Sequence, residues 1–136
     1  MKTAFVDTNL FIRYLTNDDK VKADKVEKLL ELASSGKILL VTTEMVIAEI
    51  VWVLESGYSM KAKEIAPLIR GILVTKGLEV YNRDYIIRAV ELYESTHIDF
   101  IDGYIVAVME KHEISDLFSY DRKHISRIPG ILRKEP

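Results

Sequence analysis

Apolar residues along this chain follow two alternating patterns. Short runs of consecutive apolar residues, which are typical of buried strands, alternate with longer segments in which apolar residues recur every three or four positions, as in amphipathic helices. The strand-like runs lie near residues 2–6, 38–41, 78–81 and 114–120. Strands that alternate with helices favour parallel pairing through right-handed crossovers, so the pattern predicts an α/β fold.

The helical segments lie between and after these runs, at about 10–15, 18–34, 44–55, 59–73, 82–93 and 101–112, before a short helical turn and an edge segment near 128–132. Asn17 or Asp18 is expected to cap the second helix. Pro67 predicts a kink or a restart in the fourth, because proline donates no hydrogen bond to the helix. We expect a three-layer α/β/α sandwich with a central, mostly parallel sheet of four to five strands. Without repeats or linkers, residues 1–136 are predicted to form one domain.

Carboxylates stand at the ends of two predicted strands. Asp7, followed by Thr8 and Asn9, ends the first strand, and Asp121 ends the last clear one. Taken singly, either aspartate fits an ordinary turn. Parallel strands, however, end at a common edge of the sheet, and in open α/β folds ligands bind at that edge.

Two further carboxylates interrupt apolar helices. Glu49 is the only charge in the segment 45–54. It lies on the one exposed strip of that helix, or pairs with a lysine from elsewhere in the chain, or belongs to a functional site. Asp102 opens another apolar helix, where a carboxylate also complements the helix dipole. Asp99 is a candidate N-cap of the same helix or a member of a metal site.

A divalent cation would explain all four carboxylates together, because clustered negative charges otherwise repel one another and take up protons. The chain has no cysteine, so the ligands must be oxygen or imidazole groups. Oxygen ligands favour Mg²⁺ or Mn²⁺ over zinc. The histidines lack the spacing of a helical ligand pair and are interpreted as surface or capping residues; they are His97, His112 and His124.

These motifs, in this order, resemble those of the PIN-domain nucleases, and particularly of VapC-type toxins from bacterial and archaeal toxin–antitoxin pairs. The resemblance covers residues 2–132 and implies an acidic metal site made of Asp7, Glu49, Asp102 and Asp121, with Asp99 as an additional acidic residue and Thr8, Asn9 and Ser119 as supporting polar residues. The pair Gly103–Tyr104 departs from the usual small and aliphatic pair, so Tyr104 is expected to shape the cleft. The implied activity is Mg²⁺- or Mn²⁺-dependent hydrolysis of RNA, leaving a 5′-phosphate and a 3′-hydroxyl. A homodimer and an antitoxin partner are implied as well.

The charge of the chain indicates how it could bind RNA, and its hydropathy indicates where it is located. The net charge is −2, from 19 basic and 21 acidic residues, so local bases would have to hold RNA. Two basic sets are candidates for phosphate contacts: Arg13, Lys20 and Lys22 after the first strand, and the cluster Arg122, Lys123, His124 and Arg127 just past Asp121. No apolar run reaches signal-peptide or membrane-span length, so a soluble, cytoplasmic protein without a membrane partner is expected.

Other classes of protein fit less well. A haloacid dehalogenase-type phosphatase needs a second aspartate two residues after the first, where this chain has Asn9. A receiver domain needs an acidic pair after the first strand and a lysine after the last. The remaining alternative is a catalytically weak PIN-like scaffold that acts through protein or RNA binding, although a disused site would have no reason to keep such unfavourable charges.

Overall fold

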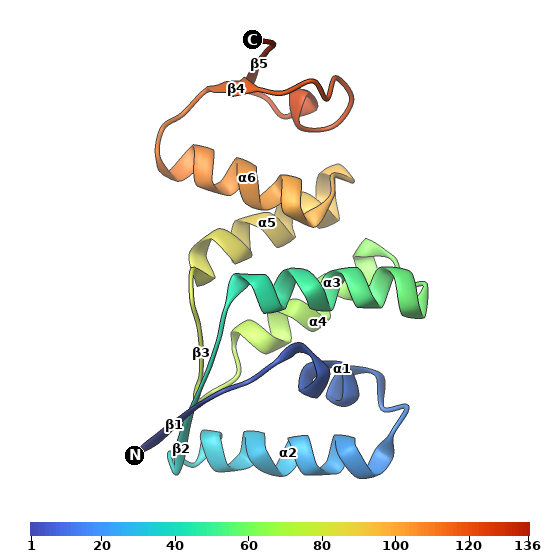
Figure 1. Ribbon diagram of the computed structural model, residues 1–136, viewed down its shortest axis with the longest axis vertical. Helices are drawn as coiled ribbons and strands as arrows, with labels where there is room; N and C mark the ends of the chain where they lie inside the picture. The colour runs from blue at the N-terminus through green and yellow to red at the C-terminus, as the bar shows by residue number, and fades with distance from the viewer. The chain divides into compact units, whose positions relative to one another are not determined.

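The computed structural model describes residues 1–136 and divides into two units, Met1–Arg83 and Asp84–Pro136 (Figure 1). Both units combine helices with parallel strand pairs, which confirms the predicted α/β class. No helix in the chain is long and apolar enough to cross a bilayer.

The first unit is built on a parallel sheet of three strands in the order β1-β2-β3. The strands are β1 (Lys2–Phe5), β2 (Ile38–Thr42) and β3 (Leu78–Val80). The pairing continues past the end of β1, since the Val6 amide donates to the Val41 carbonyl at 2.8 Å and the buried Thr42 hydroxyl donates to the Val6 carbonyl at 2.9 Å. The chain is therefore fixed to β2 up to the residue before Asp7.

Pairs of helices connect these strands, as parallel pairing requires. Between β1 and β2 lie α1 (Thr8–Thr16) and α2 (Lys20–Ser34), and between β2 and β3 lie α3 (Glu44–Tyr58) and α4 (Ala62–Leu73). Helices α1 and α2 pack against each other (Figure 1). The largest fully buried side chains of this unit come from the end of β1, from β2 and from helices α1, α3 and α4: Val6, Phe11, Leu40, Ile47, Ile50, Val51, Leu54, Ile65 and Ile69.

The predicted cap of α2 is wrong, and so is the predicted restart of the helix at Pro67. The cap of α2 is Asp19, whose Oδ1 accepts from the Lys22 amide at 3.1 Å. Asp18 instead accepts hydrogen bonds from the Tyr58 hydroxyl at 2.6 Å and from Arg13 at 3.3 Å. Pro67 does not divide its helix, because α4 runs without interruption from Ala62 to Leu73 with Pro67 exposed in its middle.

The second unit contains α5 (Arg83–Thr96), α6 (Phe100–Lys111), β4 (Asp116–Phe118), a 3₁₀ turn (Ile125–Arg127) and β5 (Leu132–Lys134). Strands β4 and β5 pair in parallel. The buried core of this unit combines residues from the two helices and their connection with residues from the C-terminal turn: Leu92, Ile98, Val106, Ile125 and Ile128.

The five strands thus form a sheet of three and a sheet of two, where the sequence pattern predicted one sheet of four to five. The last predicted strand is also shorter than expected, covering Asp116–Phe118 instead of 114–120. At the start of the predicted strand, the Ile114 amide bonds to the Met109 carbonyl at the end of α6 instead of to a neighbouring strand.

Candidate metal centre

The loop after β4 carries Asp121 in a fixed conformation. Ser119 is held on both sides, because its amide donates to the Lys134 carbonyl at 3.0 Å and its carbonyl accepts from Arg133 Nη1 at 2.7 Å. The Ser119 hydroxyl then accepts from the Asp121 amide at 3.0 Å. Strand β5 therefore positions Ser119, and Ser119 positions the backbone of Asp121.

Both carboxylate oxygens of Asp121 have partners in the same turn. Oδ1 accepts from the Lys123 amide at 2.8 Å, and Oδ2 lies 2.8 Å from His124 Nδ1. The hydrogen bond from the Lys123 backbone, followed by the interaction with His124, lowers the pKa of Asp121 below its ordinary value. Asp121 is thus held as an anion at neutral pH.

Asp102 has the opposite environment. It lies in the first turn of α6, half-buried, and makes no hydrogen bond. Burial raises its pKa, and the negative charges of Asp99 and Asp121 raise it further, against a smaller opposing effect of His124. The charged form of Asp102 is therefore less favourable here than in water.

Asp102 and Asp121 converge in the structure. Each offers an oxygen, and His124 a ring nitrogen, such that all three atoms lie within 4.8 Å of one another. Two carboxylates and an imidazole are a donor set that suits a divalent cation. The raised pKa of Asp102 fits the same conclusion, because a cation would stabilise its charged form against both the burial and the repulsion that raise the pKa.

His124 was interpreted from the sequence as a surface or capping residue. Its side chain is half-exposed, but the turn after Asp121 folds it back onto that carboxylate. The three histidines show no ligand spacing relative to one another. The available signal was the spacing of His124 three residues after a candidate ligand, a separation that a single turn closes.

Asp99 occupies the N-cap position of α6 through its backbone, since its carbonyl accepts from the Gly103 amide at 2.9 Å. Its side chain makes no capping hydrogen bond. The carboxylate is instead exposed and near enough to Asp102 to raise the pKa of that residue. Of the two roles left open, side-chain capping is therefore not observed.

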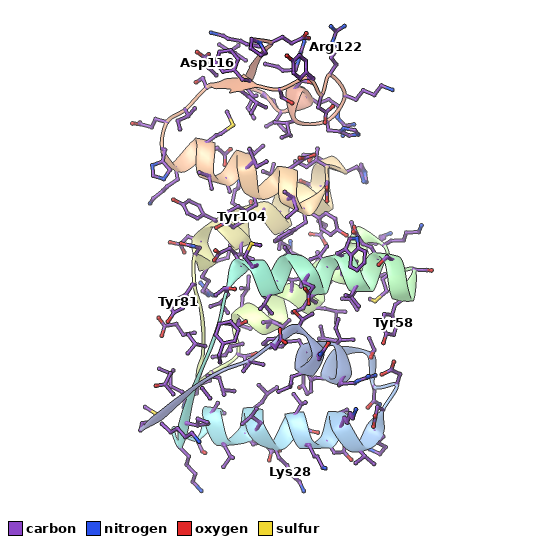
Figure 2. All side chains as sticks on the ribbon, viewed as in Figure 1. Lys28, Tyr58, Tyr81, Tyr104, Asp116 and Arg122 are labelled. Atoms are coloured by element: carbon purple, nitrogen blue, oxygen red, sulfur yellow. The ribbon has the colours of Figure 1, made fainter.

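Gly103 and Tyr104 both serve the contact between α5 and α6. A Cβ on Gly103 would lie 2.8 Å from the Ala89 carbonyl oxygen, so glycine allows the two helices to approach closely next to Asp102. Tyr104, labelled in Figure 2, meets Tyr85 edge to face with ring centroids 5.7 Å apart. Close packing of α6 on α5 accounts for both members of this unusual pair.

The other two predicted ligands belong to the first unit. Asp7 is the exposed N-cap of α1, and its Oδ1 accepts from the Thr8 amide at 2.7 Å, with Thr8 itself buried. Glu49 lies on an exposed face of α3 together with Met45 and Trp52, and it forms no ion pair with a lysine. The exposed-strip alternative for Glu49 therefore holds, and a solvent-facing carboxylate remains available as a ligand.

The predicted substrate-binding residues lie in different surroundings. Arg13 and Asn9 line a cavity of about 470 Å³ between α1 and α2, where Arg13 also pairs with Asp18 at 3.3 Å. Arg122, labelled in Figure 2, pairs with Glu135 at 3.0 Å. Lys123 has an exposed side chain without an ion pair, although its amide holds Asp121. Of the three bases, Lys123 has the least compensated charge.

Comparison with known protein families identifies the family of this chain. Residues 4–131 match the family model of the PIN domain. The chain belongs to the PIN-domain family. This confirms the resemblance that the ordered motifs indicated. Among curated proteins, this PIN-domain chain is 27% identical over 119 residues to the VapC ribonuclease of Aquifex aeolicus (strain VF5), a match that covers 87% of each chain.

Two solved structures also match this PIN-domain protein. A toxin–antitoxin complex from Klebsiella pneumoniae matches at 21% identity and a TM-score of 0.35, over 96% of both chains. VapC20 of Mycobacterium tuberculosis, a sarcin–ricin loop cleaving toxin, matches at 24% identity and a TM-score of 0.37, over 98% of this chain and 99% of that chain.

Proposed function

We propose that this PIN-domain protein is a Mg²⁺- or Mn²⁺-dependent endoribonuclease that hydrolyses RNA phosphodiester bonds as the toxin of a VapBC-type toxin–antitoxin pair. The observation that carries the proposal is the convergence of Asp102 and Asp121 in a protein of this family. The curated VapC ribonuclease among its relatives supports RNA as the substrate.

The carboxylates would contribute to metal binding in different ways, because their environments differ. Asp121, an anion fixed by two hydrogen bonds, supplies a ready negative ligand. Asp102 is half-buried and repelled by its neighbours, so it gains most from a cation. When bound, a divalent cation lowers the pKa of a water and offsets negative charge in the transition state. Asp7 and Glu49 complete the proposed catalytic set, with Asp99 as a further acidic residue.

The remaining roles concern support and substrate. Ser119 positions Asp121 by a direct hydrogen bond, and we assign the same supporting role to Thr8 and Asn9 beside Asp7. Lys123 would hold RNA phosphates close to Asp121, and Arg13 and Arg122 would do so after exchanging their acidic partners for phosphate. An antitoxin partner, a homodimer and a cytoplasmic location complete the proposal.

The decisive experiment is a cleavage assay on metal-stripped protein. Wild-type protein should cleave single-stranded RNA only after Mg²⁺ or Mn²⁺ is added, and Asp7→Asn, Glu49→Gln, Asp102→Asn and Asp121→Asn should each reduce the rate by at least about a hundredfold. Asp116→Asn is the matched control, because Asp116 lies in the second unit but is paired with Lys134 at 2.9 Å. Wild-type cleavage by Asp102→Asn would refute the assignment.

Growth and assembly assays test the toxin role separately. Expression of the wild-type chain should arrest growth, and expression of Asp102→Asn should not. Size-exclusion chromatography with light scattering tests the homodimer. If the protein binds no Mn²⁺ at millimolar concentration and cleaves no RNA, the PIN-like scaffold becomes the better description.

A further inference from the structure

His124 lies in the candidate metal centre without a role in the family pattern. Its Nδ1 is 2.8 Å from Asp121 Oδ2, and it offers a ring nitrogen within 4.8 Å of oxygens on both Asp121 and Asp102. The side chain makes no hydrogen bond outside this cluster. The imidazole therefore bonds to Asp121 and lies near Asp102, the two carboxylates that the second unit brings together.

The core of the second unit fixes the backbone beside His124. The next residue, Ile125, is buried in the cluster that contains Val106. Val106 lies one helical turn after Asp102, so it is on the same side of α6 as that carboxylate. The Ile128 amide closes the turn on the Ile125 carbonyl at 2.9 Å. Packing thus holds the turn with His124 against the helix that carries Asp102.

The measured separation suits ligation as well as a hydrogen bond. Two ligands at right angles, each at about 2.1 Å from one cation, lie about 3 Å apart. The 2.8 Å between His124 Nδ1 and Asp121 Oδ2 is close to that value. The Asp102 oxygen lies within 4.8 Å of both of these atoms, so all three residues can be ligands of one cation.

We propose that His124 is a protein ligand of the divalent cation at Asp102 and Asp121, which it binds through a ring nitrogen. This inference rests on the proposed metal dependence and extends an all-oxygen site to a mixed one. Imidazole suits later transition metals, whereas Mg²⁺ prefers oxygen. The site therefore favours Mn²⁺ and Co²⁺ over Mg²⁺ more strongly than a site made of carboxylates alone.

The test measures metal ligation directly on the full chain. Pulsed electron paramagnetic resonance of protein-bound Mn²⁺ detects nitrogen coordinated to the metal. Wild-type protein should show imidazole-nitrogen modulation, and His124→Asn should lose it. The asparagine amide can retain the hydrogen bond to Asp121, so the variant removes the imidazole nitrogen with little change to the turn. His112→Asn is the matched control, because His112 is an exposed histidine of the same unit that contacts Tyr85.

Affinity measurements separate ligation from positioning. His124→Asn should lower the affinity for Mn²⁺ and Co²⁺ about tenfold or more. The affinity for Mg²⁺, measured by competition, should fall less than about threefold. Equal weakening of all three cations would show that His124 only positions Asp121 and would overturn the proposal. Bound Mn²⁺ without nitrogen modulation in the wild type would overturn it as well, while leaving the ribonuclease proposal intact. Failure of the wild type to bind any Mn²⁺ would refute the proposed metal dependence itself.

Discussion

Replacement of Asp102 by asparagine should stabilise the metal-free protein, although it should abolish nuclease activity. The substitution removes a half-buried charge that has no hydrogen-bond donor and is repelled by neighbouring carboxylates. A like charge about 5 Å away costs about 1–3 kcal/mol for effective dielectric constants between 80 and 20. Solvent around a half-exposed site places the value at the lower end.

Part of this gain is offset by the helix dipole. Asp102 lies in the first turn of α6, where a negative charge contributes about 0.3–1 kcal/mol of stability. The net effect of Asp102→Asn in the metal-free protein should therefore be a stabilisation of up to about 0.7 kcal/mol. That corresponds to a melting temperature higher by up to about 3 °C.

The pH dependence has a definite sign. The pKa of Asp102 is raised in the folded state above its ordinary value of 3.8, so the folded state binds more protons between these two pKa values. The loss of stability caused by the charged Asp102 side chain is absent below pH 3.8 and is complete once the pH has risen through the folded-state pKa. The stability gained by Asp102→Asn over the metal-free wild type should thus be largest at neutral pH and disappear in acid.

Melting curves in EDTA and in Mn²⁺ provide the assay. Mn²⁺ at a hundred times its dissociation constant should stabilise the wild type by about 2.7 kcal/mol and leave Asp102→Asn unchanged, which reverses their order. Asp116→Asn should follow the wild type in its response to Mn²⁺. A lower melting temperature for Asp102→Asn than for the wild type in EDTA at pH 7 would refute the reasoning.

Three further substitutions test the surroundings of the site. Gly103→Ala should destabilise the protein by about 1–2 kcal/mol in denaturant titration, because its Cβ would press on the Ala89 carbonyl; an unchanged midpoint would contradict that close approach. Thr42→Val should cost about 1–2 kcal/mol by the same measurement, since the Val6 carbonyl loses its buried hydroxyl donor, and equal stability would show that this bond contributes nothing. Lys123→Gln should reduce the dependence of RNA binding on log salt concentration by about one unit, and an unchanged slope would exclude a phosphate contact.

The order and type of the elements follow from the sequence alone. Alternating apolar runs and helix-period segments predicted all six helices and the parallel pairing of β1, β2 and β3. These elements can be predicted because the burial of one helix face, or of a short strand, determines the local spacing of apolar residues. The motif order likewise predicted the PIN-domain family, which the family match confirms.

Helix caps were less predictable, because neighbouring residues compete for the same role. Asn17, Asp18 and Asp19 are all plausible caps of α2, and Asp19 takes that position while Asp18 bonds to Tyr58, forty residues further along the chain. A contact of such separation in sequence leaves no local signal. Pro67 likewise remains in α4, where the buried residues on either side of it hold the helix together.

The candidate site also combines features that local sequence predicts with features that only tertiary packing determines. Each carboxylate was selected from the sequence as a charge in an apolar setting, and the single-residue alternatives were all reasonable. Only the tertiary structure decided that Asp102 and Asp121 meet, and that His124 joins them. The physical reason is that ligands come from different elements, and their separation depends on packing such as that of Ile125 against Val106 and of Gly103 against Ala89. Local sequence sets the chemistry of each side chain, whereas packing between distant segments sets the distances that make them a site.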